Sequence, residues 1–286
     1  MSAHDHPRDN ELGVFLRTRR EAVTPAAVGL PTGPRRRTPG LRRAELATLA
    51  GVSVEYLTRL EQGRDRHPSP SVLAALAQVL GLTTRERVHL HRLTKAADPG
   101  FSCVAGAPLN AVRPTVRALL ARLEPSPALV LNRVGDVLAH TDGYRRLAEP
   151  IGLLDGDPPN HYRFVLADER ARDVYPDWEL VADDQVATLK QGPFRSDAHL
   201  APLVDELTLT AGAGFTERVA RVAGPPRSSA VRRLRHPEAG ELRLAHETLD
   251  LSDDDQRLVV LLPADDATAA ALDGLTGRHP GALRAV

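Results

Sequence analysis

The first third of the chain carries apolar residues at helical spacing. Leu12, Phe15 and Leu16 fall at positions i, i+3 and i+4, which places them on one face of an amphipathic helix. Further helices are predicted over residues 41–50, 54–62 and 70–80, and a fifth helix opens after residue 83. Residues 23–40 collect proline and glycine and therefore predict a long loop, which in a compact domain is usually functional or disordered.

Capping signals mark where these helices begin. Ser53 is a candidate N-cap for the helix over residues 54–62. Thr83 and Glu86 form a capping box ahead of the fifth helix, in which Val88 and Leu93 are expected to pack inward. The N-terminal part of the chain is therefore predicted to be an all-α domain of five helices.

Beyond residue 108 the pattern alternates between helix and strand. Helices are predicted over residues 112–123, 144–148, 169–175, 178–190, 200–209, 215–222 and 267–275. Strands are predicted over residues 128–134, 136–141, 230–236, 242–251 and 257–262, with the apolar run Val259–Leu262 typical of a central strand. We expect an α+β domain in which helices cover one side of an antiparallel sheet.

The charge distribution separates the two parts of the chain. The 286 residues, enough for two domains, balance 37 basic against 37 acidic side chains. Residues 1–100 hold 16 basic and 10 acidic side chains, a net of +6, and the remainder holds 21 and 27, a net of −6. This asymmetry predicts that the N-terminal domain meets a polyanion.

Several classes of protein are excluded. The single cysteine, Cys103, forms no internal disulfide and fits a reducing cytoplasm. The polar N-terminus has no signal-peptide pattern, and the longest apolar run, Leu258–Leu262, is far shorter than the roughly 20 residues of a membrane span. No catalytic, phosphate-binding or metal-ligand motif occurs, so we expect neither an enzyme nor a cofactor nor a metal.

Residues 46–60 have the spacing of a helix-turn-helix motif. Ala47 and Ala50 are small enough for two helices to touch, Gly51 tolerates the positive φ of the turn, and Val52 is an apolar plug. In the second helix Val54, Leu57 and Leu60 are expected to face inward. The alternative interpretation is a pair of ordinary bundle helices.

The outer face of the second helix is the candidate base-reading surface. The residues expected to face DNA there are Ser53, Glu55, Tyr56, Thr58 and Arg59. A guanidinium such as that of Arg59 can bind guanine O6 and N7 and choose the sequence. The alternatives are that Arg59 contacts a phosphate or pairs with Glu55 on the surface.

Arginines near the motif are candidate phosphate contacts. They are Arg35, Arg36, Arg37, Arg42, Arg43 and Arg64. Residues 35–43 carry no acidic side chain, so the loop is expected to neutralise phosphates beside the recognition helix. The alternative is a solvated run of charges.

Residues 10–95 closely resemble the XRE-type, lambda-repressor-like helix-turn-helix domain. The resemblance is carried by the segments LAGVS, YLTRLEQG and SPSVLAALAQVLGL. It implies that residues 45–61 read double-stranded DNA, and that the protein binds a palindromic operator as a homodimer.

Residues 108–276 are similar to the ligand-binding domain of MmyB-like transcription regulators, which are common in actinobacteria. The carrying residues are Asp136–Ala139, Asn160, Arg163, Phe164, Tyr175, Trp178, Phe215, His236, Pro237, Gly240, Leu242, Glu247, Asp255, Gln256 and Leu258–Val260. The resemblance implies a PAS-like fold with an internal cavity for an apolar, fatty-acid-like ligand. Candidate lining residues are Leu138, His140, Phe164, Trp178, Phe215, Val219, Leu244 and Val260.

This chain departs from the pattern of that family at several positions. His140-Thr141 stands where relatives commonly have a Trp-Asn pair, and Val219 and Val222 stand where they have Trp and His. If these residues line the pocket, the ligand differs or its binding is lost. Phe164, Trp178 and Phe215 also have a plain interpretation as core residues.

Together these features predict a cytoplasmic, sequence-specific DNA-binding transcription regulator that acts as a repressor. The expected domains are the DNA-binding domain over residues 1–97, a linker over 98–108 and the ligand-binding or dimerisation domain over 109–286. The alternative is a ligand-independent regulator whose second domain is a structural dimerisation module.

Overall fold

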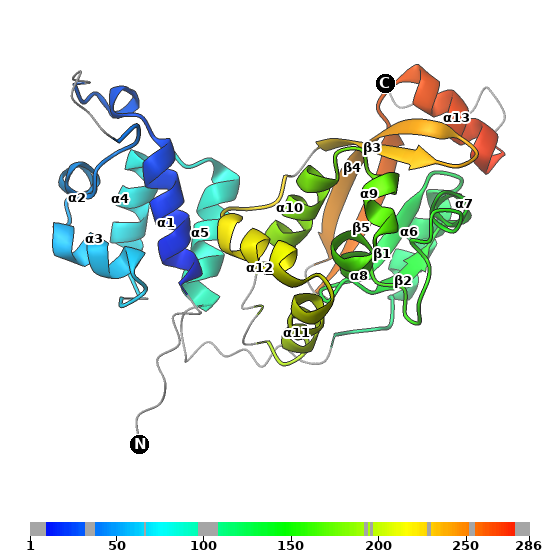
Figure 1. Cartoon of the computed structure of the whole chain (residues 1–286), viewed down its shortest axis with the longest axis horizontal. Helices are drawn as coiled ribbons and strands as arrows, with labels where there is room; N and C mark the ends of the chain where they lie inside the picture. Colours follow the sequence, from blue (N-terminus) through cyan, green and yellow to red (C-terminus); the bar gives the residue numbers. More distant parts are fainter. Residues whose placement is uncertain are drawn as a thin grey trace. The chain divides into compact units, whose positions relative to one another are not determined.

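The chain divides into two compact units (Figure 1). The computed structural model describes residues 10–31, 38–65, 67–96, 108–191, 194, 197–227, 230–251 and 255–277. The helical unit spans Met1–Val104 with Lys190–Ser196 and Ala220–Pro225. The sheet unit spans Ala105–Leu189, Asp197–Val219 and Pro226–Val286.

The helical unit contains all five predicted helices. They are α1 (Glu11–Ala22), α2 (Arg43–Ala50), α3 (Val54–Glu61), α4 (Pro70–Val79) and α5 (Thr84–Ala96). The predicted loop over residues 23–40 contains a short 3-10 helix, η1 (Pro25–Val28). Leucines dominate the core between these helices, and Leu16, Leu46, Leu57, Leu60 and Leu76 are each 0% exposed.

The capping signals are confirmed. The Ser53 hydroxyl accepts a hydrogen bond from the Tyr56 amide at 3.0 Å, which satisfies one of the free N–H groups at the start of α3. In the capping box, the Glu86 carboxylate accepts from the Thr83 amide at 2.8 Å and the Thr83 hydroxyl accepts from the Glu86 amide at 3.3 Å.

Two inward assignments were wrong. Val88 is 48% exposed, because α5 presents the adjacent face to the core through His89, Leu90 and Leu93. The His89 ring packs edge-on against a core phenylalanine, and burial lowers its pKa to about 4. Val54 is 39% exposed, because it occupies the first position of α3, ahead of the face that Leu57 and Leu60 bury.

A buried ion pair joins the first and third helices. The Arg20 Nε lies 2.6 Å from Oε1 of Glu61, and the two residues are 4% and 0% exposed. The same carboxylate accepts from Arg43 Nε at 2.7 Å, and Arg20 Nη1 donates to the Leu41 carbonyl at 2.8 Å. The Glu61 carboxylate therefore fixes α3 against α1 and against the start of α2.

The sheet unit combines further helices with five strands in its described residues. The helices are α6 (Pro114–Arg122), α7 (Asp142–Ala148), α8 (His161–Ala167), α9 (Arg170–Val174), α10 (Trp178–Leu189), α11 (Leu200–Thr210), α12 (Gly212–Arg221) and α13 (Asp266–Thr276). The strands are β1 (Ala128–Asn132), β2 (Val137–His140), β3 (Ala230–His236), β4 (Gly240–Leu251) and β5 (Gln256–Pro263). They form one antiparallel sheet in the order β2-β1-β5-β4-β3. The predicted α+β, PAS-like fold is confirmed, with β5 as the central strand.

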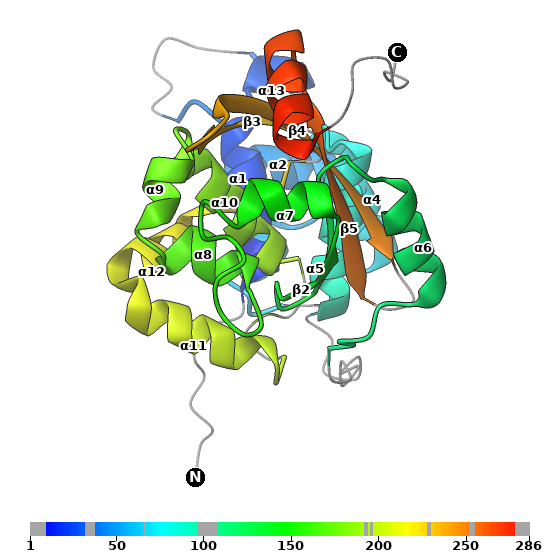
Figure 2. The ribbon, with the colours of Figure 1, turned by 90° about the vertical axis from the view of Figure 1, so that its right-hand side faces the viewer.

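Helices cover both faces of this sheet, not one side as expected. Ala128, Val130, Leu258 and Val260 form a cluster with α6 residues such as Val116. Figure 2 shows α6 on one side of β4 and β5, and α8, α9 and α10 on the other. The side chains on both faces of β1 are buried. This does not occur in a sheet with one face in water, so the prediction of one covered side was wrong.

Helix α8 was missed by the sequence analysis. It has only seven residues, and its apolar side chains are nearly continuous along the chain, so they give no helical period. Asn160 caps it by accepting from the Arg163 amide at 3.0 Å. Gly135, in the turn between β1 and β2, packs against this helix: its φ is +87°, and a Cβ there would collide with the Tyr162 ring, so only glycine fits. No helix of the described residues is long and apolar enough to cross a bilayer.

Replacing Glu61 by Gln tests the ion pair. The change leaves the Arg20 guanidinium buried without its counter-charge, which we expect to destabilise the helical unit by about 3–5 kcal/mol. Urea unfolding is followed by circular dichroism, which reports both units, and by fluorescence of Trp178, the only tryptophan, which reports the sheet unit. The circular dichroism transition should move to lower urea while the Trp178 transition stays.

The matched control is Glu55→Gln, at an exposed position of the same helix, which should change the stability by less than about 0.5 kcal/mol. Equal effects of the two substitutions would contradict a structural role for Glu61.

Candidate nucleic-acid interface and ligand sites

The α2–turn–α3 segment has the geometry of a helix-turn-helix. Ala47 and Ala50 are 1% and 8% exposed where the two helices meet. Gly51 adopts the left-handed conformation with φ +66°, which a residue with a Cβ adopts at a cost. Val52 packs half-buried against the core cluster. The turn residues therefore play the parts that the sequence assigned to them.

Helix α3 presents a polar face away from this core. Ser53, Glu55 and Arg59 are exposed, whereas Tyr56 and Thr58 are half-buried. The Arg59 guanidinium lies 5.7 Å from the centre of the Tyr56 ring, so the two side chains lie side by side. Burial raises the pKa of Tyr56, and Asp65 adds to the rise, so this phenol remains a neutral hydrogen-bond donor.

The predicted phosphate contacts fall into three groups. Arg42 and Arg64 are exposed, Arg42 at the start of α2 and Arg64 just after α3. The Arg43 Nε instead binds the buried Glu61, so this side chain contributes to the core as well as to the surface charge. Arg35, Arg36 and Arg37 lie outside the described residues.

Two apolar side chains of the helix-turn-helix are exposed. Val54 is 39% exposed at the first position of α3, and Leu49 is 40% exposed near the end of α2. The sequence analysis missed them because an apolar residue within a helix is usually buried. The position of Val54 at the helix start, beside its N-cap, is the signal that could have indicated exposure.

The eight predicted ligand-binding residues do not gather in one place. Leu138 and Val260 belong to the cluster beneath α6. Leu244 is 0% exposed on β4, on the opposite face of the sheet from its neighbour Ala245. His140 is exposed, and its ring lies 6.1 Å from that of Tyr144.

The remaining four candidates, three aromatic residues and Val219, lie on helices of the sheet unit. The Phe164 ring packs at 6.5 Å from that of Tyr175, and Val219 is buried on α12. Trp178 and Phe215 line a pocket of about 210 Å³ that includes Arg172 and Arg218. Both guanidiniums lie over the Trp178 ring, at 4.5 and 4.9 Å from its centre, so this pocket is polar.

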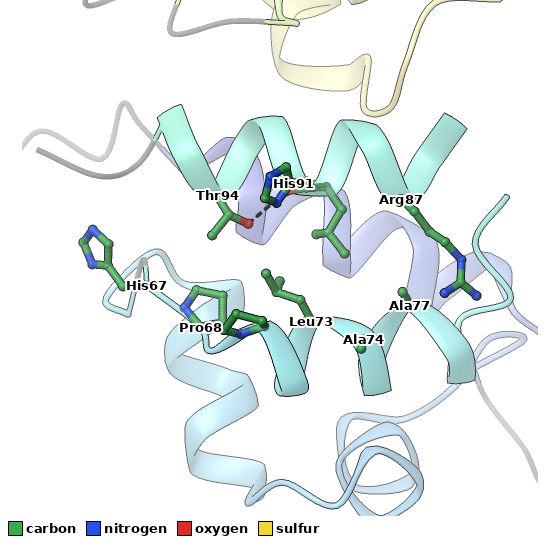
Figure 3. Close-up of a pocket in the computed structure, with 10 residues that line it drawn as sticks. His67, Pro68, Leu73, Ala74, Ala77, Arg87, His91 and Thr94 are labelled. Carbon is green, nitrogen blue, oxygen red and sulfur yellow. Dashed lines mark hydrogen bonds between the residues drawn. The ribbon is translucent and has the colours of Figure 1, made fainter. Parts of the chain in front are cut away.

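A larger groove of about 410 Å³ lies between α4 and α5 of the helical unit (Figure 3). Its lining is mainly apolar and includes Pro68, Leu73, Ala74 and Ala77, with Arg87 at its edge. No predicted ligand-binding residue lines it. The groove uses residues of α4, α5 and the loop before α4, so its lining is distinct from the exposed face of α3.

Comparison with protein families agrees with this architecture. A helix-turn-helix domain model matches residues 11–90. The model of the MmyB-like transcription regulator ligand binding domain matches residues 112–275, more than half of the chain. A search of curated proteins found no match.

The helix-turn-helix geometry and the second domain together define a DNA-binding transcription regulator with a ligand-binding domain. The chain belongs to the MmyB-like transcription regulator family. Both matched domains are those of transcription regulators and not of enzymes. Within the described residues, no three His, Cys, Asp or Glu side chains gather as metal ligands.

Proposed function

We propose that this protein is a cytoplasmic homodimer that represses transcription by binding a palindromic operator, and that a small apolar, fatty-acid-like ligand of the sheet unit modulates it. The observation that carries the proposal is the exposed face of α3. The opposite face of this helix is buried in the core, whereas Glu55 and Arg59 are exposed to solvent. A helix anchored in this way can enter the major groove with its N-terminal half against the bases.

The side chains of this face divide by the part of DNA that they would contact. Arg59 would bind guanine, and the exposed Val54 methyl groups would contact the thymine methyl group. Arg42 and Arg64 lie at the ends of the motif, where phosphates flank the groove. Base choice and overall affinity are therefore assigned to different residues.

A homodimer follows from the resemblance to lambda-repressor-like domains. A two-fold dimer would hold its two α3 helices about 34–36 Å apart, one turn of DNA. Bound at a promoter, it would exclude the polymerase, which is repression. A ligand changes operator affinity only if it binds the two conformational states of the regulator with different affinities.

A second candidate is a regulator whose sheet unit binds no ligand and serves dimerisation alone. One observation favours it: the predicted ligand-binding residues lie in separate places, and several of them are packed in the core.

Substitution of Arg59 separates base reading from phosphate binding. Arg59→Ala should lower the preference for the selected operator at one base pair by about 1–3 kcal/mol. Arg42→Ala, the matched control, should weaken binding to every duplex alike and lower the salt slope by about one. Fluorescence anisotropy with matched and single-base-changed duplexes at several salt concentrations measures both. Uniform weakening by Arg59→Ala would assign Arg59 to phosphate and contradict base reading.

The dimer makes a prediction about stoichiometry. Light scattering of the purified chain with an operator duplex should give a mass that corresponds to two chains per duplex. Cleavage of the bound duplex should show two protected half-sites one helical turn apart. One chain per palindromic duplex would contradict the proposal.

Thermal unfolding separates the two candidate functions. A ligand that binds the native state raises its stability by RT ln(1 + [L]/Kd), about 2.7 kcal/mol at a hundredfold excess over Kd. We therefore expect fatty acids from a lipid and metabolite screen to raise the melting temperature. If no compound does so, the structural dimerisation module is the better account.

A further inference from the structure

The groove between α4 and α5 has two walls of equal length. On each helix the lining residues recur at spacings of three, four and seven, from Pro70 to Ala77 on α4 and from Arg87 to Thr94 on α5. Residues at these spacings lie on one face of a helix, and seven residues span about 10 Å, or two turns. The groove is therefore elongated and about two helical turns long (Figure 3).

The α4 wall of this groove is apolar. Helix α4 carries no charged side chain, and the small side chains of Ala74 and Ala77 allow another helix to approach closely. Leu73 is half-buried and Ala74 is exposed. Across the groove, the Thr94 hydroxyl donates to the Leu90 carbonyl at 2.9 Å, so its hydrogen is used within α5. An occupant would therefore meet mainly methyl and methylene groups.

The α5 wall of this groove is basic. The arginines of α5 are Arg85, Arg87 and Arg92. The one carboxylate of this helix, Glu86, is already paired with Arg19 of α1 at 2.9 Å. The charge of α5 is therefore mostly left to be balanced by solvent ions or by a partner.

Arg87 marks one end of the groove, as Figure 3 shows. Its Nε donates to the Leu82 carbonyl at 3.0 Å, which holds the guanidinium in place. Among the residues that the structure describes, no carboxylate pairs with Arg87. The two Nη groups can bind a carboxylate of an occupant, and such charged hydrogen bonds are stronger than neutral ones.

The two walls together favour one kind of occupant. A second copy that packed its α5 against this α5 would bring two basic walls together, which like-charge repulsion disfavours. A DNA backbone is anionic, but it offers no apolar surface to cover Leu73 and Ala77. An amphipathic helix with acidic flanks matches both the apolar wall and the basic one.

We propose that the groove between α4 and α5 binds an amphipathic helix of another protein whose apolar face is flanked by aspartate or glutamate. Apolar side chains at positions i, i+3, i+4 and i+7 of that helix would fill the two turns of the groove, and a carboxylate would bind Arg87. The proposal goes beyond operator binding. Because the lining is distinct from the exposed face of α3, the groove leaves that face free for DNA.

Synthetic helical peptides test the groove by fluorescence anisotropy with the full chain. Each labelled peptide has about 20 residues, because shorter helices are marginal in water, with leucine at the groove-facing positions. The first peptide has glutamate on both flanks, the second has lysine there, and the third keeps the glutamates but has serine for leucine. At physiological salt, the leucine–glutamate peptide should bind with a Kd at least tenfold lower than that of either other peptide.

Substitutions in the groove locate the binding. Arg87→Glu should raise the Kd of the leucine–glutamate peptide at least tenfold and lower that of the lysine peptide, because it reverses the charge at one end. Ala74→Arg fills the groove while adding a positive charge, and it should also raise the Kd at least tenfold. Attraction between charges alone would give the opposite result for Ala74→Arg.

The matched control is Arg92→Glu, an exposed arginine of the same helix that does not line the groove. It should change the Kd of the leucine–glutamate peptide less than about twofold, because charges on the surface are screened within about 8 Å at this salt concentration. Circular dichroism melting of every variant checks that the helical unit is folded.

The contrary results are distinguishable. Absence of binding by all three peptides, or binding that Ala74→Arg leaves unchanged, would overturn the groove as the docking site. Tighter binding of the lysine peptide, or equal effects of Arg87→Glu and Arg92→Glu, would overturn the acidic partner. Self-association of the chain that Ala74→Arg abolishes would assign the groove to a second copy instead. These measurements contain no DNA, so they do not depend on whether the proposed operator is found.

Discussion

The orientation of helix α3 depends on one buried carboxylate. Glu61, at the last position of α3, binds Arg20 of α1 and Arg43 at the start of α2. Leucine packing alone is non-directional, whereas a bidentate ion pair fixes both distance and angle. The hydrophobic core brings these helices together, and the ion pair specifies how α3 sits among them. Arg43 also links the surface to the core, because its side chain is nearly half exposed while its partner, Glu61, is fully buried.

Most of the helical unit could be predicted because its signals are local. Ser53, Gly51 and the Thr83–Glu86 box act within one turn of chain. The ion pair could not be predicted, since residues 20 and 61 are distant in sequence and charged side chains within helices are usually exposed. One weak signal existed: Glu61 lies four residues after the buried Leu57, on the inner face of α3. The prediction for Val54 was wrong because its burial was inferred from a helix face shared with Leu57 and Leu60, whereas its position at the start of the helix decides its exposure.

For the sheet unit, the sequence predicted most of the individual helices and strands, but it did not predict how they pack together. The bounds of β3 were predicted exactly as they occur, and β5 is central as its apolar run indicated. Sequence alone cannot show which side chains from distant strands meet, so the candidate ligand residues were collected from family resemblance and lie apart. Helix α8, which the sequence analysis missed, brings His161 close to Arg232 of β3, and no local pattern in the sequence indicates that these residues meet.

The measurement that tests the central claim most directly is the selection of bound fragments from random duplex DNA by the purified full chain. The account predicts recovery of a two-fold symmetric sequence bound about 10³-fold or more tightly than unselected duplex at moderate salt. It would be contradicted if the recovered fragments shared no sequence, and if heparin or unselected duplex competed as well as any of them.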